Sequence, residues 1–173
     1  AIDVSKPMNG VRYENDNGIA TITIDRSARG NSLTPAMQAM FRAIWSDVRD
    51  NPEVRVAMIT AAGDRHFCTG FDVSEADSET AADEVFVDKP LREAVFWSPY
   101  QNDVWKPVIC VVNGTCVGGG HHFVVDADIV IADRLARGKR NWGRFDIAIE
   151  GRHPLLPVIA WSMNRRSRLT GIC

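Results

Sequence analysis

Residues 106–120, KPVICVVNGTCVGGG, join an almost continuous apolar run to a turn and three consecutive glycines. An apolar run without polar alternation is typical of a strand that is buried on both faces. Residues 121–128, HHFVVDAD, follow directly, and we expect them to begin a helix. A strand that leads through glycines into a helix exposes backbone N–H groups that suit an anion or an oxyanion.

A second glycine-containing turn, HFCTGFD at residues 66–72, follows a predicted strand at residues 54–60. Neither turn has the pattern of a nucleotide-binding loop. No Lys-Ser/Thr pair follows the glycines as in a P-loop, and their spacing is not G-x-G-x-x-G. Close packing of a helix would also explain three glycines, so the pair of turns is more informative than either turn alone.

Outward from these turns, predicted strands and helices alternate along the chain. Thr34 is a good N-cap and Pro35 suits the first helical turn, and apolar residues then recur on one face, so residues 35–49 are expected to be helical. The other expected elements are strands at 18–25, 54–60, 106–114 and 129–132, a helix at 91–105 interrupted near Pro99, and an acidic loop at 74–85. This alternation predicts an α/β fold.

The composition is that of a globular protein, with 173 residues of which 45% are hydrophobic. No apolar run approaches the roughly 20 residues of a membrane span, and the first residues lack the pattern of a secretory signal. The four cysteines are irregularly spaced without a C-x-x-C pair, which indicates reduced thiols and neither a zinc site nor disulfides. We therefore expect a cytoplasmic protein that has no membrane partner.

The net charge of −2 conceals an asymmetry along the chain. Residues 1–133 contain 11 basic and 20 acidic side chains, whereas residues 134–173 contain 9 basic and 2 acidic ones. A basic end is compatible with nucleic acid or CoA phosphates, but a solvated face or an atypical tail explains it better. We expect no nucleic-acid partner, and we divide the chain into a core at 1–133 and an atypical continuation of the same domain at 134–173.

The order of motifs resembles the crotonase (enoyl-CoA hydratase/isomerase) family over about residues 18–132. The resemblance rests on DR-x4-NSL at residues 25–33, FCTGFD at 67–72, the glycine-rich turn within 106–120 and DIVIA at 128–132. It implies a spiral of ββα repeats, an assembly as a homotrimer or a dimer of trimers, and an acyl-CoA thioester as substrate. No separate cofactor is implied, because coenzyme A is part of the substrate.

The resemblance also implies the residues that bind the substrate. One backbone N–H from each glycine turn, at Phe71 and at Gly119, would hold the thioester oxygen in an oxyanion hole, where it stabilises an enolate. The implied substrate-binding residues are Arg26, Arg29, Cys68, Thr69, Gly70, Asp72 and Gly118. Either arginine could instead be an ordinary solvated side chain.

The acid–base residues depart from the family pattern, which uses two glutamates. His122 occupies the first of these positions, and imidazole can exchange a proton near pH 7, although His122 could also simply pack in its helix. Without gaps the second position is Trp142, whereas a short insertion makes Asp146 the candidate and leaves Glu150 as a weaker one. His121 points elsewhere on the helix, so it is assigned a structural role and no metal site is expected.

The resemblance thus implies an enoyl-CoA hydratase or isomerase, which is an enzyme of the lyase or isomerase class. The alternatives are a hydrolase of the same fold and a non-catalytic homologue that binds acyl-CoA or supports an oligomer. Leu169-Thr170-Gly171 resembles a family landmark that helices normally follow, so we expect a C-terminal helical region that is truncated or atypical.

Overall fold

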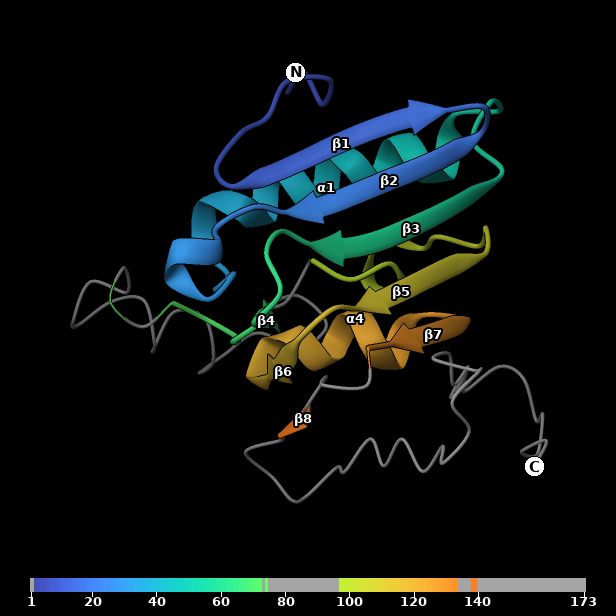
Figure 1. Cartoon of the computed structure of the whole chain (residues 1–173). Helices are drawn as coiled ribbons and strands as arrows, with labels where there is room; N and C mark the ends of the chain where they lie inside the picture. Colours follow the sequence, from blue (N-terminus) through green and yellow to red (C-terminus); the bar gives the residue numbers. More distant parts are fainter. Residues whose placement is uncertain (1, 73, 75–96, 134–137, 140–173) are drawn as a thin grey trace, which may run out of the picture.

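A five-stranded sheet with strand order β1-β2-β3-β5-β7 forms the centre of the computed structural model, which describes residues 2–72, 74, 97–133 and 138–139 (Figure 1). Strands β1 (Val11–Asp16) and β2 (Ile19–Ile24) form an antiparallel hairpin. Asn17 and Gly18 connect them with φ values of 49° and 82°, as expected of an Asn-Gly hairpin turn. Strands β3 (Val56–Ala61), β5 (Val108–Val112) and β7 (Ile129–Ala132) continue the sheet in parallel with β2.

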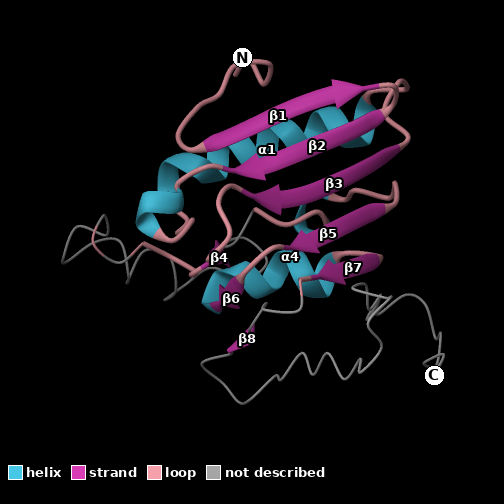
Figure 2. Ribbon diagram, viewed as in Figure 1, coloured by secondary structure: helices cyan, strands magenta, loops and turns pink. Residues whose placement is uncertain are grey.

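Helix α1 (Pro35–Asp50) covers one face of this sheet beside β1 and β2 (Figure 2). The Thr34 hydroxyl accepts a hydrogen bond from the Met37 N–H, and Pro35 occupies the first turn, as the sequence predicted. The helix buries a stripe of apolar side chains against the sheet: Met37, Met40, Phe41, Ile44, Trp45 and Val48. This stripe supplies much of the hydrophobic core.

A second, three-stranded sheet lies beyond the main one and contains β4 (His66–Cys68), β6 (Thr115–Val117) and β8 (Gly138–Lys139) in the order β4-β6-β8. The pairs β3–β4, β5–β6 and β7–β8 each place one strand in each sheet. The 3₁₀ turn η3 (Gly118–Gly120) and helix α4 (His121–Asp126) follow β6. Among the described residues, β5, β6 and α4 thus form one ββα unit of the kind that the family resemblance predicted.

Most of the elements predicted from the sequence are confirmed, but the helix over residues 91–105 is wrong in its described part. There the chain forms only the short 3₁₀ turn η2 (Tyr100–Asn102) after Pro99, and it ends at Asp103 with a φ of 54°. Residues 91–96 and 74–85, apart from Ser74, lie outside the described residues. Strands β1, β4, β6 and β8 were not predicted. Within the described part of the chain, no helix is long and apolar enough to cross a membrane.

Candidate active site

The two glycine turns lie side by side because the strands that lead into them are paired. Strand β4 pairs in parallel with β6, and Cys68 lies opposite Cys116. Residues that follow these strands therefore emerge together at one edge of the small sheet. A Cβ atom built on Gly70 would lie 3.1 Å from the Gly119 nitrogen and 3.2 Å from the Val117 oxygen, so the two backbones are in direct contact.

Glycine is required at this contact for two reasons. Gly70 has a φ of +90°, a conformation that residues with a side chain rarely adopt. Gly120 packs against Cys68 so closely that an added Cβ would lie 2.8 Å from the Cys68 Cβ. Close packing is thus one reason for the three consecutive glycines, and it brings the turns together.

The backbone of the first turn directs the Phe71 amide away from Leu33. Leu33 and Phe71 form a parallel bridge in which the Leu33 N–H donates to the Gly70 oxygen and the Asp72 N–H donates to the Leu33 oxygen, both at 2.8 Å. Successive amides of an extended chain point in opposite directions, so the Phe71 N–H points to the other side. Gly119 lies at the start of a helical stretch, where N–H groups have no preceding turn to bond. Neither N–H has an acceptor among the described residues.

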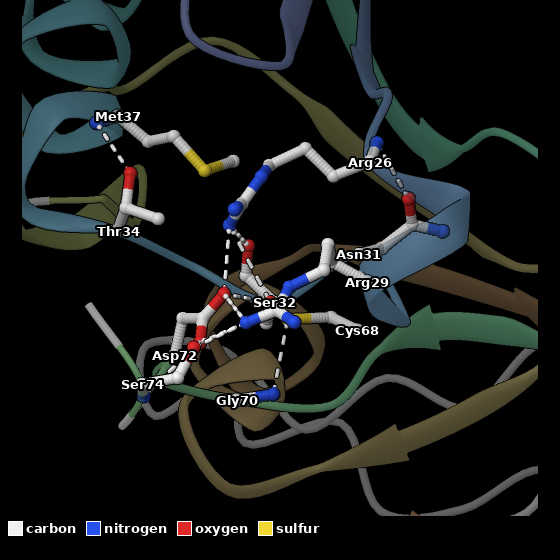
Figure 3. A network of polar contacts seen from close by, with 10 residues as sticks. All are labelled: Arg26, Arg29, Asn31, Ser32, Thr34, Met37, Cys68, Gly70, Asp72 and Ser74. Carbon is white, nitrogen blue, oxygen red and sulfur yellow. Dashed lines mark hydrogen bonds and ion pairs between the residues drawn. The ribbon is translucent and has the colours of Figure 1, made fainter.

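Asp72 holds the first turn in place through a network of polar contacts (Figure 3). The carboxylate accepts hydrogen bonds from Ser74 Oγ at 2.7 Å and Ser32 Oγ at 2.9 Å. It also forms ion pairs with Arg29 at 3.2 Å and Arg26 at 3.3 Å. The Ser74 and Ser32 hydroxyls and the Arg29 guanidinium hold the pKa of Asp72 well below its usual range, although burial opposes them.

This network bears on the two arginines that were predicted to contact CoA. Both guanidinium groups face Asp72, and Arg26 also donates to the Ser32 carbonyl at 2.9 Å. The Arg26 side chain is 16% exposed, whereas that of Arg29 is 54% exposed. Their contact in the structure is therefore with the turn itself. The contact with CoA phosphate stays a prediction, and Arg29 has more surface available for it.

The other residues of the first turn are packed within the protein. Thr69 donates its N–H to the Gly30 carbonyl at 3.1 Å. The Cys68 thiol accepts from the Gly70 N–H at 3.5 Å, and burial raises its pKa to about 12, so the thiol is neutral at physiological pH.

Cys68, Cys110 and Cys116 are all free and buried. No group of His, Cys, Asp or Glu among the described residues could hold a metal ion.

His122 lies on α4, three residues after Gly119, and its ring is partly buried. The ring meets the indole of Trp97 edge-on, with centroids 6.4 Å apart and an interplanar angle of 73°. His121 is buried in the core at 3% exposure, which agrees with the structural role assigned to it. Asp146, Glu150 and Trp142 lie outside the described residues, so the second acid–base position stays a prediction.

Comparison with known proteins identifies the family. Residues 14–146 match the model of the enoyl-CoA hydratase/isomerase family, which is well over half of the chain. The chain belongs to the enoyl-CoA hydratase/isomerase family.

Relatives and solved structures in this family have the same fold and varied activities. The chain is 36% identical over 127 residues to an (E)-benzylidenesuccinyl-CoA hydratase of Thauera aromatica, covering 73% of the chain and 48% of the relative. It is 31% identical over 138 residues to a hydroxycinnamoyl-CoA hydratase-lyase of Pseudomonas fluorescens, covering 77% of the chain and 50% of the relative. A crystal structure of an enoyl-CoA hydratase/isomerase from Mycobacterium paratuberculosis superimposes with a TM-score of 0.63 at 30% identity, covering 78% of the chain and 49% of that structure. The chain thus spans about half the length of the relatives it matches.

In this enoyl-CoA hydratase/isomerase homologue, the predicted α/β crotonase-like fold is confirmed. The two glycine turns that were predicted to form the oxyanion hole lie side by side. Sequence reasoning missed Trp97, which contacts both Gly119 and His122. No motif singled it out, because these contacts join residues that are more than 20 positions apart in the chain.

Proposed function

We propose that the protein is an acyl-CoA-processing enzyme of the hydratase/isomerase type, with the Phe71 and Gly119 amides as its oxyanion hole. The observation that carries this proposal is the contact between the two turns. Gly70 meets Gly119 backbone to backbone, and each turn contributes an N–H without an acceptor among the described residues. Membership of the family supplies the chemical context, because the substrates named for its members are CoA thioesters.

The oxyanion hole acts on the thioester carbonyl. When a nucleophile adds to C3 of an enoyl thioester, or a proton leaves C2 or C4, negative charge accumulates on the thioester oxygen as an enolate. Two fixed N–H groups stabilise this charge more than they stabilise the neutral carbonyl, so they lower the barrier. Removal of one such donor costs about 2.7–4 kcal/mol of barrier in other enzymes. Asp72 and its partners contribute by holding the first turn rigid.

Proton transfer is assigned to His122, with Asp146 as the second candidate. In hydration, the neutral His122 imidazole accepts a proton from water as the water oxygen bonds to C3, and a proton is delivered to C2 as the enolate collapses.

The assembly as a homotrimer and the cytoplasmic location stay predictions, and one relative, from Arabidopsis thaliana, is named as a peroxisomal enzyme.

The decisive experiment measures hydration of crotonyl-CoA by the wild type and by His122→Ala. We expect kcat to fall by about 10²–10⁴-fold, since this is the usual contribution of a general acid–base group. His122→Glu, which installs the residue type that the resemblance gives at this position, should retain much more activity than His122→Ala.

Three measurements separate the alternative functions. Acyl-CoA binding measured by calorimetry should be similar in the wild type and in His122→Ala. Tight binding without turnover over a panel of enoyl-CoA thioesters would contradict the proposal and indicate a non-catalytic homologue. Release of free CoA thiol from a saturated acyl-CoA would indicate a hydrolase instead.

A further inference from the structure

Trp97 carries a buried hydrogen-bond donor whose purpose the fold does not explain. Its side chain is 4% exposed, and its Nε1–H has no acceptor among the described residues. An indole N–H can only donate, so it cannot be satisfied by another donor. A buried donor without a partner destabilises a protein by about 1–3 kcal/mol, and such groups in native structures usually have a reason.

The donor-bearing edge of the indole lies at the proposed oxyanion hole. A Cβ built on Gly119 would be 3.2 Å from Trp97 Cζ2. Cζ2 and Nε1 are bonded to the same ring carbon, so the edge that carries the N–H lies near the second glycine turn. The same ring meets His122 at 6.4 Å. Trp97 therefore borders both the proposed thioester-oxygen site and the proposed acid–base residue.

The position of Trp97 is fixed by hydrogen bonds from separate elements. Trp45 of α1 donates its Nε1–H to the Trp97 carbonyl at 2.7 Å. The next residue, Ser98, donates its hydroxyl to Asp126 at the end of α4, and its carbonyl accepts from Asn102 at 2.8 Å. These bonds hold the backbone that carries the indole, so the ring is positioned before a partner binds, which limits the entropy lost on binding.

We propose that Trp97 is a specificity-determining residue, which selects acyl groups that carry a hydrogen-bond-accepting oxygen beyond the thioester. This inference rests on the proposed function, because it places the acyl chain next to Gly119. A purely hydrocarbon chain would leave the Nε1–H unpaired on binding, whereas a chain with a hydroxyl or carbonyl oxygen would pair it. Sites built around a buried donor discriminate strongly against ligands that lack the matching group.

The test compares two thioesters that differ at one position, 4-hydroxybut-2-enoyl-CoA and pent-2-enoyl-CoA. The second replaces the terminal hydroxyl of the first with a methyl group, so the two chains have almost the same length and volume. We expect the wild type to bind the hydroxylated thioester about tenfold more tightly, a typical value for one hydrogen bond. Trp97→Phe keeps an aromatic ring but removes the donor, and it should reduce this ratio to near one.

Further variants distinguish loss of the N–H donor from a general effect on folding. Replacement of Trp97 by 3-benzothienylalanine exchanges the N–H for sulfur in a ring of the same shape, and it should also abolish the preference. Trp105→Phe removes an indole that is 70% exposed and should leave the ratio unchanged. Equal affinity of the wild type for both thioesters, or a preference that survives in the sulfur isostere, would overturn the inference. If neither thioester binds the wild type, the proposed function fails, and the inference fails with it.

Discussion

At the scale of single residues, Asp72 connects the first glycine turn to the loop that precedes α1. Its carboxylate connects the turn that contains Phe71 to Ser32 and Arg26, which belong to the loop before α1. The Leu33–Phe71 backbone bridge lies between these contacts. Loss of the carboxylate should therefore loosen the turn in which the Phe71 amide is held.

We predict that Asp72→Asn destabilises the protein in a pH-dependent way. The native pKa of Asp72 is lowered by the Ser74 and Ser32 hydroxyls and by Arg29. A carboxylate with a lowered native pKa stabilises the fold fully above its unfolded pKa of about 3.9, and this contribution is lost as the pH falls through the native value. Urea unfolding of wild type and variant should differ most near neutral pH, and the difference should shrink in strong acid.

The matched control for this prediction is Asp64→Asn, because Asp64 is exposed and forms no ion pair or hydrogen bond with the other described residues. Its free energy of unfolding should follow that of the wild type at every pH. A difference between Asp72→Asn and wild type that stayed constant into strong acid would show that the carboxylate charge is not what stabilises the turn.

At the scale of elements, a side-chain hydrogen bond connects the edge strand β1 to α1. The Tyr13 hydroxyl donates to Asp47 Oδ2 at 2.5 Å, and burial and this hydrogen bond raise the pKa of Tyr13 well above its usual range. The hydroxyl is therefore neutral under all ordinary conditions and acts as a donor. This bond connects the first strand of the sheet to the helix that covers it.

We predict that Tyr13→Phe lowers the free energy of unfolding by about 1 kcal/mol, the net value of a typical hydrogen bond. Urea denaturation measures this change, and Tyr100→Phe, at a tyrosine that is 51% exposed, is the control of the same chemical type. Acyl-CoA affinity should not change, since the Tyr13 hydroxyl faces α1 from the main sheet, whereas the glycine turns follow strands of the small sheet. A loss of affinity equal to that of a site variant would contradict this separation.

The sequence predicted those elements whose pattern is local. Helix α1 has a cap, a proline and a periodic apolar face, and β5 is a continuous apolar run, so both were found. Strands β4 and β6 have three residues each and exist because they pair with one another across the chain, which no local pattern records. The prediction of a helix over 91–105 was wrong in its described part, because the turn that follows Pro99 ends at Asp103 in a left-handed conformation that a helix does not continue through.

The same distinction applies to the candidate site. The glycines could be recognised because a turn with positive φ and close backbone contact accepts almost no other residue. The ion pairs of Asp72 with Arg26 and Arg29, and the contact of Trp97 with Gly119, depend on tertiary structure. Sequence alone therefore predicted the backbone of the site better than its side chains.

At the scale of the whole molecule, Phe123 joins the layers of the fold. Its ring is fully buried on α4, 5.2 Å from the ring of Phe41 on α1 and 6.3 Å from that of Phe67 on β4. These aromatic contacts connect the helix that carries His122 to the main helix and to the small sheet. We therefore expect the position of His122 to depend on this cluster of three rings.

We predict that Phe123→Ala lowers the free energy of unfolding by about 3–5 kcal/mol, because it removes a large buried ring and leaves a cavity among close-packed side chains. Phe123→Leu should cost clearly less, since leucine fills more of the same space. Urea denaturation followed by circular dichroism measures both changes, and the partly buried Val124 provides a neighbouring control as Val124→Ala. If Phe123→Ala lowered the free energy of unfolding no more than Val124→Ala, the contacts among the three rings would not stabilise the packing of α4 on α1 and β4. If the cost is as large as expected, crotonyl-CoA hydration by Phe123→Leu should also fall, because the helix that carries His122 is less firmly held.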